Sequence, residues 1–530
     1  MNLAIVAAAA LALAAMLLAA RGQDRGASGR GSDHGARWAT GSELRPLRGG
    51  HIDSNSPAGA GVGSAGRRLL GALLGTRPAG QVGRLGIGIR RRRTLYAEAR
   101  HALVAFGPPQ SGKSAGLAIP ALLEWEGPAV ASSIKSDLLA ATIARRAQIG
   151  PVYVFDPFAL SGTPAHTWSP LRGAQTWDGA LEVAWRLASA GELDQRGVDG
   201  GDFWAVAAEQ RLAPILFAAA HWCGGPAAPG ANAIDQVVRW VYGQGADELE
   251  TALDRLAIGS GGPRERADAR AAYDAAVAFD RQADRTRSSI EATAQALLRA
   301  YRFTQVARSA DSCEITPDAL LGTNATLFLI GDAKASKLLR PIFLALLGEI
   351  VDAAYERAGA HGGRLPRPLL LCLDEAGNVA PIPNLAEIAS TAPSHNIQIV
   401  TIFHDLAQAR ARYGQQAETV VNSHRARMLL PGVADLETLR YFSGLVGDAD
   451  RSEQSRTAGS GGSSRSTSTR RLPLLAPEAL RQLPEGHALL VYGRLPPVIV
   501  RLRCWFAHRR LRRLARGDPQ ITDPTTLIER

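Results

Sequence analysis

One stretch of the sequence constrains the fold more than any other. It is the segment Gly107-Pro108-Pro109-Gln110-Ser111-Gly112-Lys113-Ser114, which follows the apolar residues 102–106. Its spacing is that of a phosphate-binding loop, in which backbone N–H groups surround the phosphates of a nucleotide, Lys113 contacts the β and γ oxygens, and Ser114 ligates Mg²⁺. Because the chain has only four lysines, a chance match is a weak explanation. We predict that residues 107–114 bind ATP with Mg²⁺; a Gly-Pro turn with a solvated lysine is the alternative.

Strands and helices alternate after the phosphate loop. Short apolar runs, typical of fully buried strands, are separated by segments with helical spacing, which is the signature of a parallel sheet covered on both faces. The sequence therefore predicts an α/β fold with a doubly wound, mainly parallel sheet. The strand-like runs are residues 102–106, 128–134, 152–155, 325–330, 369–373 and 398–403.

A second chemical element lies at the end of the apolar run 369–373, which leads directly into Asp374 and Glu375. In P-loop ATPases an acidic residue at this place holds Mg²⁺, and the next one polarises the attacking water. We therefore predict Ser114 and Asp374 as metal ligands and Glu375, together with Lys113, as catalytic residues. Without a phosphate loop, this pattern would more often be a strand end followed by a helix cap. The acidic pair therefore indicates an ATPase site only because the phosphate loop is present.

Two further predictions concern polar residues beside strands. His404 follows the run 398–403, where a polar side chain is placed to sense the γ-phosphate; a hydrogen-bonded loop histidine is an equally good alternative. Arg425 and Arg427 precede the apolar residues 428–430 and are candidates for an arginine that reaches the nucleotide of a neighbouring subunit. Because arginine is abundant in this chain, surface roles for both are the simpler alternative.

Composition limits the class of protein. With 530 residues, of which 46% are hydrophobic, the chain is long enough for two or more domains. The net charge of +11 comes almost entirely from arginine, which suits phosphate recognition but also fits a genome that prefers arginine codons. Cys223, Cys313, Cys372 and Cys504 are scattered without a C-x-x-C pair, which indicates neither disulfides nor a metal cluster.

An apolar run extends from residue 3 to residue 20 and is followed by Arg21, Arg25 and Arg30. No basic residue precedes the run, so it lacks the charged start of a secretory signal, and the positive-inside bias keeps the following chain in the cytoplasm. We predict a transmembrane anchor over residues 1–20, hence a single-pass protein of the cell membrane with most of the chain cytoplasmic. An Ala-rich helix that is buried or cleaved is the alternative.

The remaining chain divides by composition. Residues 21–95 are predicted as a largely flexible linker that ends in the basic residues 90–93, a solvated charge run or a contact for anionic groups. Residues 96–176 and 301–507 form the two parts of a P-loop NTPase domain around an all-α insertion over residues 177–300. Within the second part, the Ser/Thr/Gly/Arg tract 451–471 is predicted as a disordered loop, and residues 508–530 form a basic tail.

The order of these parts resembles that of the type IV secretion coupling proteins, the membrane-anchored ATPases of bacterial conjugation. Besides the phosphate loop and the acidic pair, smaller segments carry the resemblance, and their serial order is more specific than any one of them. They are residues 35–40, 118–125, 135–137, 168–171, 202–204, 285–290, 371–377, 413–414 and 471–475.

The resemblance implies a RecA-like domain with an all-α insertion, assembled as a homo-hexamer around a pore in the bacterial inner membrane. It also implies ATP hydrolysis coupled to the transfer of a single DNA strand bound to a relaxase, or of a protein substrate, into a type IV secretion channel. Contacts with DNA phosphates are sequence-independent and leave no motif, so the residues themselves support a motor and an anchor but do not identify the cargo.

The chain departs from the family pattern at two positions. Ser133 stands where the family usually has aspartate, and His404 where it usually has glutamine. Most members also carry two membrane helices, whereas this chain offers one apolar run. Two other functions stay open: a septal-type translocase of double-stranded DNA, which would normally carry several membrane helices and a winged C-terminal module, and a membrane-tethered scaffold that binds ATP without hydrolysing it.

Overall fold

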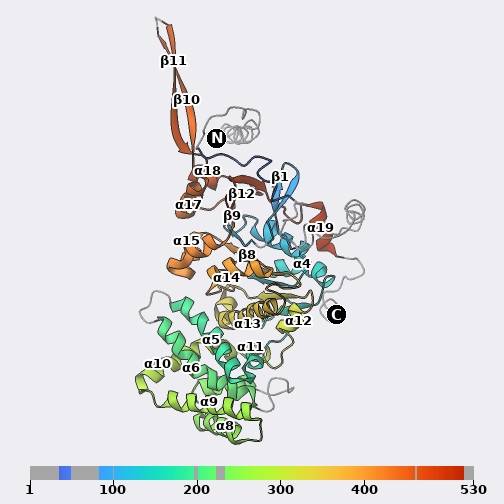
Figure 1. Ribbon diagram of the computed structural model, residues 1–530, viewed down its shortest axis with the longest axis vertical. Helices are drawn as coiled ribbons and strands as arrows, with labels where there is room; N and C mark the ends of the chain where they lie inside the picture. The colour runs from blue at the N-terminus through green and yellow to red at the C-terminus, as the bar shows by residue number, and fades with distance from the viewer. Residues whose placement is uncertain are drawn as a thin grey trace.

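The computed structural model describes residues 35–48, 83–99, 101–195, 201–222, 233–459 and 462–517. A large sheet occupies the middle of the molecule (Figure 1). Its strands are β1 (Gly86–Arg90), β2 (Arg93–Tyr96), β3 (Leu103–Phe106), β4 (Ala129–Ser133), β5 (Val152–Phe155), β6 (Thr326–Ile330), β7 (Leu369–Leu373), β8 (Ile397–Phe403), β9 (Ala426–Leu429), β12 (His487–Tyr492) and β13 (Val498–Arg501).

The eleven strands lie in the order β2-β1-β13-β12-β9-β3-β8-β7-β4-β6-β5. All neighbouring pairs from β9 to β5 are parallel. The pairs from β2 to β9 are antiparallel. The fold is therefore mixed α/β with a large, mostly parallel sheet, which confirms the predicted class.

The strand β7 shows how the sheet uses both faces. Leu369, Leu371 and Leu373 belong to one buried hydrophobic cluster, whereas Leu370 and Cys372 belong to another. Successive side chains of a strand point to opposite faces, so a continuous apolar run supplies a layer of core on each side of the sheet.

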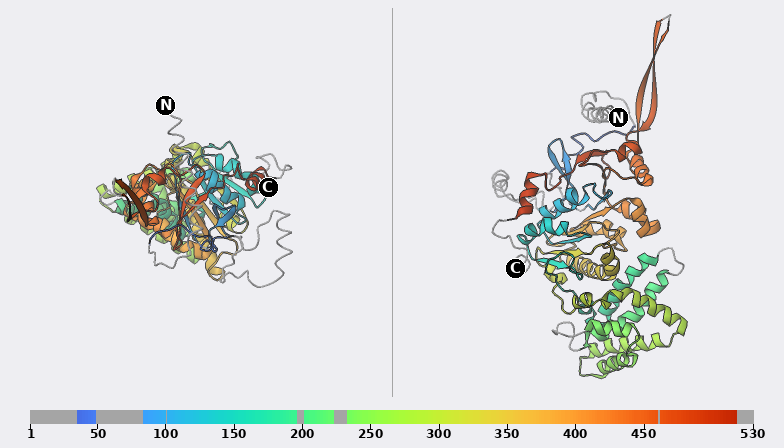
Figure 2. Two further views of the ribbon diagram at one scale, coloured as in Figure 1. Left: turned by 90° about the horizontal axis from the view of Figure 1, so that it is seen from above. Right: turned by 180° about the vertical axis from the view of Figure 1, so that it is seen from behind.

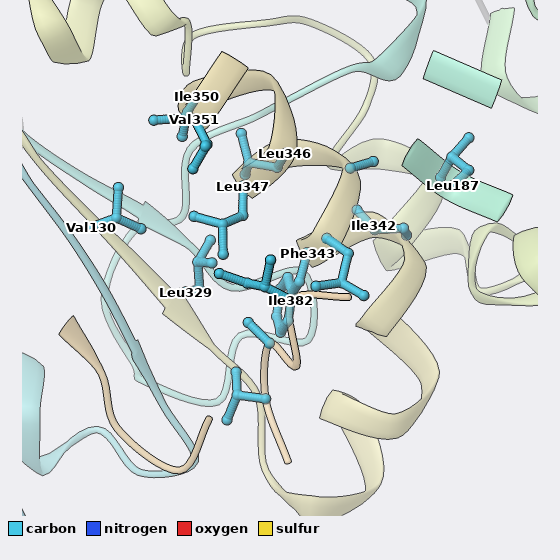
Figure 3. Close-up of a cluster of buried hydrophobic side chains, with 14 of the residues drawn as sticks. Val130, Leu187, Leu329, Ile342, Phe343, Leu346, Leu347, Ile350, Val351 and Ile382 are labelled. Atoms are coloured by element: carbon cyan, nitrogen blue, oxygen red, sulfur yellow. The ribbon is translucent and has the colours of Figure 1, made fainter. Parts of the chain in front are cut away.

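Helices cover both faces of the sheet. The helices α3, α4 and α19 bury apolar residues in one of the two clusters, and α13 with α14 to α17 does so in the other. Figure 3 shows this second layer, where Phe343, Leu346 and Ile350 of α13 lie near Val130 and Leu329 of the sheet. The helices outside the insertion are η3 (Ser114–Ala118), α3 (Ile119–Glu124), α4 (Asp137–Ala147), η4 (Pro170–Gln175), η6 (Arg299–Arg302), α11 (Thr304–Arg308), α12 (Pro317–Leu321), α13 (Ala333–Ala360), α14 (Leu385–Thr391), η7 (Ala392–His395), α15 (Leu406–Tyr413), η8 (Gly414–Gln416), α16 (Ala417–Ser423), α17 (Leu436–Val446), α18 (Pro477–Arg481) and α19 (Arg509–Arg516).

A block of helices separates β5 from β6 in the chain. It comprises α5 (Trp177–Gln195), α6 (Gly201–Ala220), α7 (Ala233–Val241), α8 (Ala246–Ile258), α9 (Pro263–Asp280) and α10 (Asp284–Leu298). Figure 1 shows these helices at one end of the molecule, beyond α13. An ion pair of 2.8 Å between Arg186 Nε of α5 and Asp352 Oδ2 of α13 joins the block to the sheet-bearing part.

The tract 451–471 forms a hairpin in its described part, so the prediction of a disordered loop is wrong there. The strands β10 (Asp448–Gly459) and β11 (Gly462–Pro473) pair antiparallel from Asp448↔Pro473 to Gly459↔Gly462. Figures 1 and 2 show the hairpin projecting from the body. The absence of large apolar residues prevents a packed core, but an antiparallel ladder satisfies its own backbone groups, and threonine suits an extended chain.

The prediction of a largely flexible linker over residues 21–95 is also wrong for its described part. β1 and β2 extend the main sheet, and residues 35–48 pack beside them, with Tyr96 N donating to Leu47 O over 2.7 Å. Gly88 has a φ of 151°, and a Cβ there would lie 2.8 Å from Val500. The glycines that suggested a flexible linker therefore include one that allows close strand packing.

The predicted anchor over residues 1–20 and residues 518–530 of the predicted tail lie outside the described residues. Within the described ranges, no helix combines the length and apolarity needed to cross a bilayer. Residues 509–516 form α19, in which Leu511 is fully buried while Arg509 and Arg512 are exposed. This part of the basic tail is thus a packed helix with a charged outer face.

Candidate nucleotide-binding site

Three parallel strands bring most of the predicted site residues to one edge of the sheet. β8 lies between β3 and β7, and all three run in the same direction. The carboxyl ends of parallel neighbours meet at one edge, which is where open α/β sheets bind their ligands. The phosphate loop after β3, His404 after β8 and the acidic pair after β7 therefore lie together.

The phosphate loop is a tight cradle of backbone. Gln110, with a φ of 66°, and Gly112, with a φ of 89°, adopt left-handed conformations. A Cβ on Gly107 would lie 2.5 Å from Ser111 Oγ and 3.0 Å from Leu430 Cβ, so a larger residue there would force neighbouring side chains to shift. Ser111 Oγ is buried and has no hydrogen-bond partner among the described residues. A cramped backbone turn with an unpaired hydroxyl fits a phosphate group as ligand.

Ser114 and Asp374 meet across the site. Ser114 Oγ donates a hydrogen bond of 2.5 Å to Asp374 Oδ2, whereas Asp374 Oδ1 is buried without a partner among the described residues. Burial raises the pKa of Asp374 to about 6, and the hydrogen bond from Ser114 and the charge of Lys113 oppose this rise. A hydroxyl beside an unpaired carboxylate oxygen fits Mg²⁺, whose charge would keep the carboxylate ionised.

A metal ion at this site would need further ligands from outside the chain. The described ranges contain no group of three or more His, Cys, Asp or Glu side chains that could hold a metal. Mg²⁺ commonly binds through one or two protein oxygens, with water and substrate phosphates completing its octahedron. Ser114 and Asp374 fit that pattern rather than an all-protein cage.

Lys113, His404 and Glu375 form a chain of polar contacts. Lys113 Nζ donates to His404 Nδ1 over 2.8 Å and lies 4.0 Å from Glu375 Oε1. Because an ammonium only donates, Nδ1 accepts, and the ring proton resides on Nε2, which lies 3.3 Å from Glu375 Oε2. The hydrogen bond from His404 is the main reason that the pKa of Glu375 falls to about 2, so this carboxylate is ionised at neutral pH.

The sequence analysis did not identify the residues that hold His404, Glu375 and the backbone after Glu375 in position. Asn378 Nδ2 donates to Glu375 Oε2 over 3.0 Å, and Gln408 Oε1 accepts from His404 N over 2.7 Å. Arg412 Nε donates to Gly377 O over 2.6 Å. The only sequence signal for Asn378 and Gln408 is their place soon after Glu375 and His404. Arg412 has none, because it lies on α15, which follows β8, whereas Gly377 follows β7.

The structure does not bring Arg425 and Arg427 to this edge. Both lie at the start of β9, where Ala426 pairs with Leu103 at the start of β3, so they are at the opposite edge from the phosphate loop of the same chain. Arg427 Nη2 donates to Asn422 O over 2.9 Å, at the end of α16. Arg425 Nε lies 3.9 Å from Glu98 Oε2, and its side chain is 46% exposed. Neither arginine is placed to contact the phosphate loop of its own chain.

Comparisons with known proteins agree on one group. The family model described as "Type IV secretory system Conjugative DNA transfer" matches residues 60–525. Conjugal transfer protein TraG of Escherichia coli is 24% identical over 405 residues, a match that covers 72% of this chain and 62% of that protein. The chain therefore spans less than two thirds of the length of this relative.

Solved structures share the fold. The bacterial conjugative coupling protein TrwBdeltaN70, in an unbound form, superposes with a TM-score of 0.56 and 18% identity, over 78% of this chain and 87% of that one. TrwB in complex with ADP and Mg²⁺ gives a TM-score of 0.54 with 18% identity and the same coverage. At this level of identity the likeness concerns the fold alone.

Proposed function

Because this chain belongs to the type IV secretory system conjugative DNA transfer family, we propose that it is a membrane-anchored ATPase of bacterial conjugation. It couples ATP hydrolysis to the transfer of relaxase-bound single-stranded DNA, or of a protein substrate, into a type IV secretion channel. Residues 1–20 hold it in the inner membrane, and the bulk of the chain lies in the cytoplasm.

One observation carries this proposal. Residues far apart in the chain meet at a single sheet edge, with Ser114 Oγ 2.5 Å from Asp374 Oδ2 and Lys113 Nζ 4.0 Å from Glu375 Oε1. A phosphate loop, a buried carboxylate with an unpaired oxygen and an ionised second carboxylate are the parts that phosphoryl transfer to water requires.

Each residue has one task in this mechanism. Ser114 and Asp374 hold Mg²⁺, which neutralises charge on the phosphates when bound. Lys113 exchanges its contact with His404 for the β and γ oxygens of ATP. Glu375, kept ionised by its hydrogen bonds, orients the attacking water and accepts its proton. His404 Nδ1, released by Lys113, takes up a proton when it acts as the sensor, because only an N–H can donate to the γ-phosphate.

Assembly completes the site. The proposed form is a homo-hexameric ring around a pore, in which ATP lies between subunits and an arginine from one subunit contacts the nucleotide of the next. Arg425 is our first candidate because its side chain is 46% exposed and its ion-pair distance to Glu98 is a long 3.9 Å. Arg427 is the second, because it already caps α16.

The test compares three variants of the full chain. Lys113→Ala removes the cation from the phosphate loop and should abolish ATP binding, hydrolysis and DNA transfer together. Glu375→Gln keeps the shape of the site and should bind ATP while hydrolysis falls about 100-fold or more. Lys334→Ala, which removes an exposed lysine at the start of α13, is the matched control and should behave as wild type.

Three measurements are needed: ATP affinity, ATPase rate with single- and double-stranded DNA, and transfer frequency in a mating assay. Stimulation by double-stranded DNA alone would favour a septal-type translocase. ATP binding without hydrolysis in wild type, and transfer that survives Glu375→Gln, would favour a scaffold. DNA transfer that persists in Lys113→Ala would contradict the proposal.

A further inference from the structure

The segment after β13 packs beside the phosphate loop and on η3, the helix that follows it. A Cβ added to Gly116 of η3 would be 3.0 Å from Leu502 Cβ, and one added to Gly112 of the loop would be 3.9 Å from Leu502 Cδ1. Three residues later, Trp505 N donates to Ala115 O over 3.0 Å. Leu502 and Trp505 thus contact the first turn of η3, directly after Lys113, although they come from the far end of the described chain.

The direction of a bound nucleotide follows from the loop. In a phosphate loop the lysine contacts the β- and γ-phosphates, and the backbone of the loop surrounds the α- and β-phosphates. The ribose and base therefore leave the site on the side away from the γ-phosphate, past the first residues of the following helix. Here those residues are Ser114 to Gly116, which is where Trp505 is bonded.

Trp505, whose backbone binds there, is followed in the chain by a second aromatic residue, Phe506. Phe506 is 55% exposed, so its ring is accessible to a ligand. Its ring centroid lies 6.0 Å from that of Trp505 at an interplanar angle of 81°, so the indole supports the phenyl ring edge to face.

The backbone around these rings is held firmly. Arg503 Nη2 forms a buried ion pair of 2.8 Å with Glu124 Oε2, and its side chain is 2% exposed. Ala507 N and His508 N both donate to Cys504 O, which closes a turn around Phe506. An exposed aromatic ring on a rigid turn is a preformed stacking surface, because little conformational entropy is lost when a ligand covers it.

We propose that Phe506, supported by Trp505, is the platform on which the base of the nucleoside triphosphate stacks. The inference rests on the proposed function, since it concerns the same nucleotide. Stacking needs only a π-face, so the platform contributes affinity for any base rather than selection among bases.

The experiment separates the base from the phosphates. Full-length wild type and Phe506→Ala are titrated with ATP and, separately, with inorganic tripolyphosphate, both with Mg²⁺. Loss of the platform should weaken ATP binding about tenfold and leave tripolyphosphate binding unchanged. Phe506→Trp, which keeps an aromatic face, should restore ATP affinity.

Phe303→Ala is the matched control. Phe303 is 50% exposed and also has an edge-to-face aromatic neighbour, Phe158, at 5.6 Å, but it lies beside the helical block. It should leave both affinities unchanged.

The outcomes keep this inference apart from the proposed function. Two results would contradict the proposed role of Phe506: equal ATP affinity in wild type and Phe506→Ala, or an equal loss of affinity for ATP and tripolyphosphate. Lys113→Ala, titrated in parallel, should weaken both ligands. If Lys113→Ala weakened neither, the proposed function itself would fail, whatever Phe506 does.

Discussion

Glu375 has a backbone conformation that non-glycine residues rarely adopt, with a φ of 57°. Residues in this region cost on the order of 1 kcal/mol and persist where the surroundings determine them. Here the surroundings are the hydrogen bonds that Asn378 and His404 make to its carboxylate. The strain agrees with the proposed role of Glu375, in which its carboxylate is held in one orientation toward a water.

His424 offers a test of buried electrostatics at a single residue. It is 0% exposed, its Nδ1 donates to Val420 O over 2.7 Å, and its Nε2 accepts from Thr401 Oγ1 over 2.9 Å. Burial is the main cause that lowers its pKa to about 4, assisted by the charge of Arg427 and opposed by the Val420 carbonyl. The ring is therefore neutral in the folded protein.

We expect this histidine to make stability depend on pH. The unfolded ring titrates near pH 6.5, so below that pH the unfolded chain binds a proton that the folded chain does not. Its contribution to the free energy of unfolding is almost complete above about pH 6.5. It declines as the pH falls, and at pH 5 the free energy of unfolding is lower by about 2 kcal/mol. Thermal unfolding at pH 7 and pH 5 should show a smaller pH effect for His424→Gln than for wild type. His361→Gln, at an exposed histidine, is the control and should match wild type; identical pH effects in all three would contradict the prediction.

Motifs in which each residue type has one chemical use predict which residues lie together, while their roles stay predictions. The convergence of Lys113 with Asp374 and Glu375 follows from the motifs and the parallel sheet. The contact between Lys113 and His404 does not, because it depends on β8 lying between β3 and β7, an order that the sequence leaves open. The hydrogen bond from Arg427 to Asn422 O likewise follows from the folded structure and not from a sequence motif.

Among the elements, the hairpin of β10 and β11 differs most from the sequence-based expectation. Its twelve paired positions run from Asp448↔Pro473 to Gly459↔Gly462, and neither strand joins the main sheet. Two-stranded hairpins are marginally stable alone. The polar composition of the tract indicates that it has no packed core, but composition does not reveal backbone pairing between its two halves. For this reason the sequence predicted a disordered loop where the structure has a hairpin.

We expect the hairpin to contribute little to the stability of the body. Replacing residues 452–469 by an Asn-Gly turn shortens β10 and β11 and keeps the base at Asp448 and Pro473, where the ladder begins. The melting temperature of the body should change by less than about 2 °C, because no part of the eleven-stranded sheet is removed. The measurement is thermal unfolding followed by circular dichroism. A large drop in melting temperature would show that the hairpin packs on the body.

For the whole molecule, the segment after β13 joins distant parts of the chain. Arg503 pairs with Glu124 at the end of α3, and its Nη2 also donates to Gly86 O of β1 over 3.1 Å. Arg510 Nη1 lies 3.8 Å from the second oxygen of Glu124. Both members of the main pair are buried, with side chains 2% and 1% exposed.

Arg503→Ala should therefore destabilise the protein by about 3 kcal/mol, because it removes one partner of a buried ion pair and leaves the buried charge of Glu124 less well compensated. The double variant Arg503→Met with Glu124→Gln should recover most of that loss, since no buried charge remains. Unfolding by urea gives both free energies. Equal stability of Arg503→Ala and wild type would refute the role of this pair.

The parallel strands and the helical block could be predicted from the sequence, whereas two antiparallel strands could not. Alternating apolar runs predicted the parallel strands, and the long stretch without such a run corresponds to α5 to α10. The antiparallel strands β1 and β2 were not predicted, because a Gly-rich segment resembles a linker until β13 is known to pack against it.

The strand order has a consequence for biosynthesis. β3, which carries the phosphate loop, is flanked by β8 and β9, and the whole helical block from α5 to α10 is translated after β3 and before β8. A nascent chain that has emerged only as far as the helical block exposes both edges of β3, a state prone to wrong pairing. A product that terminates before β9 therefore leaves one edge of β3 without its partner strand.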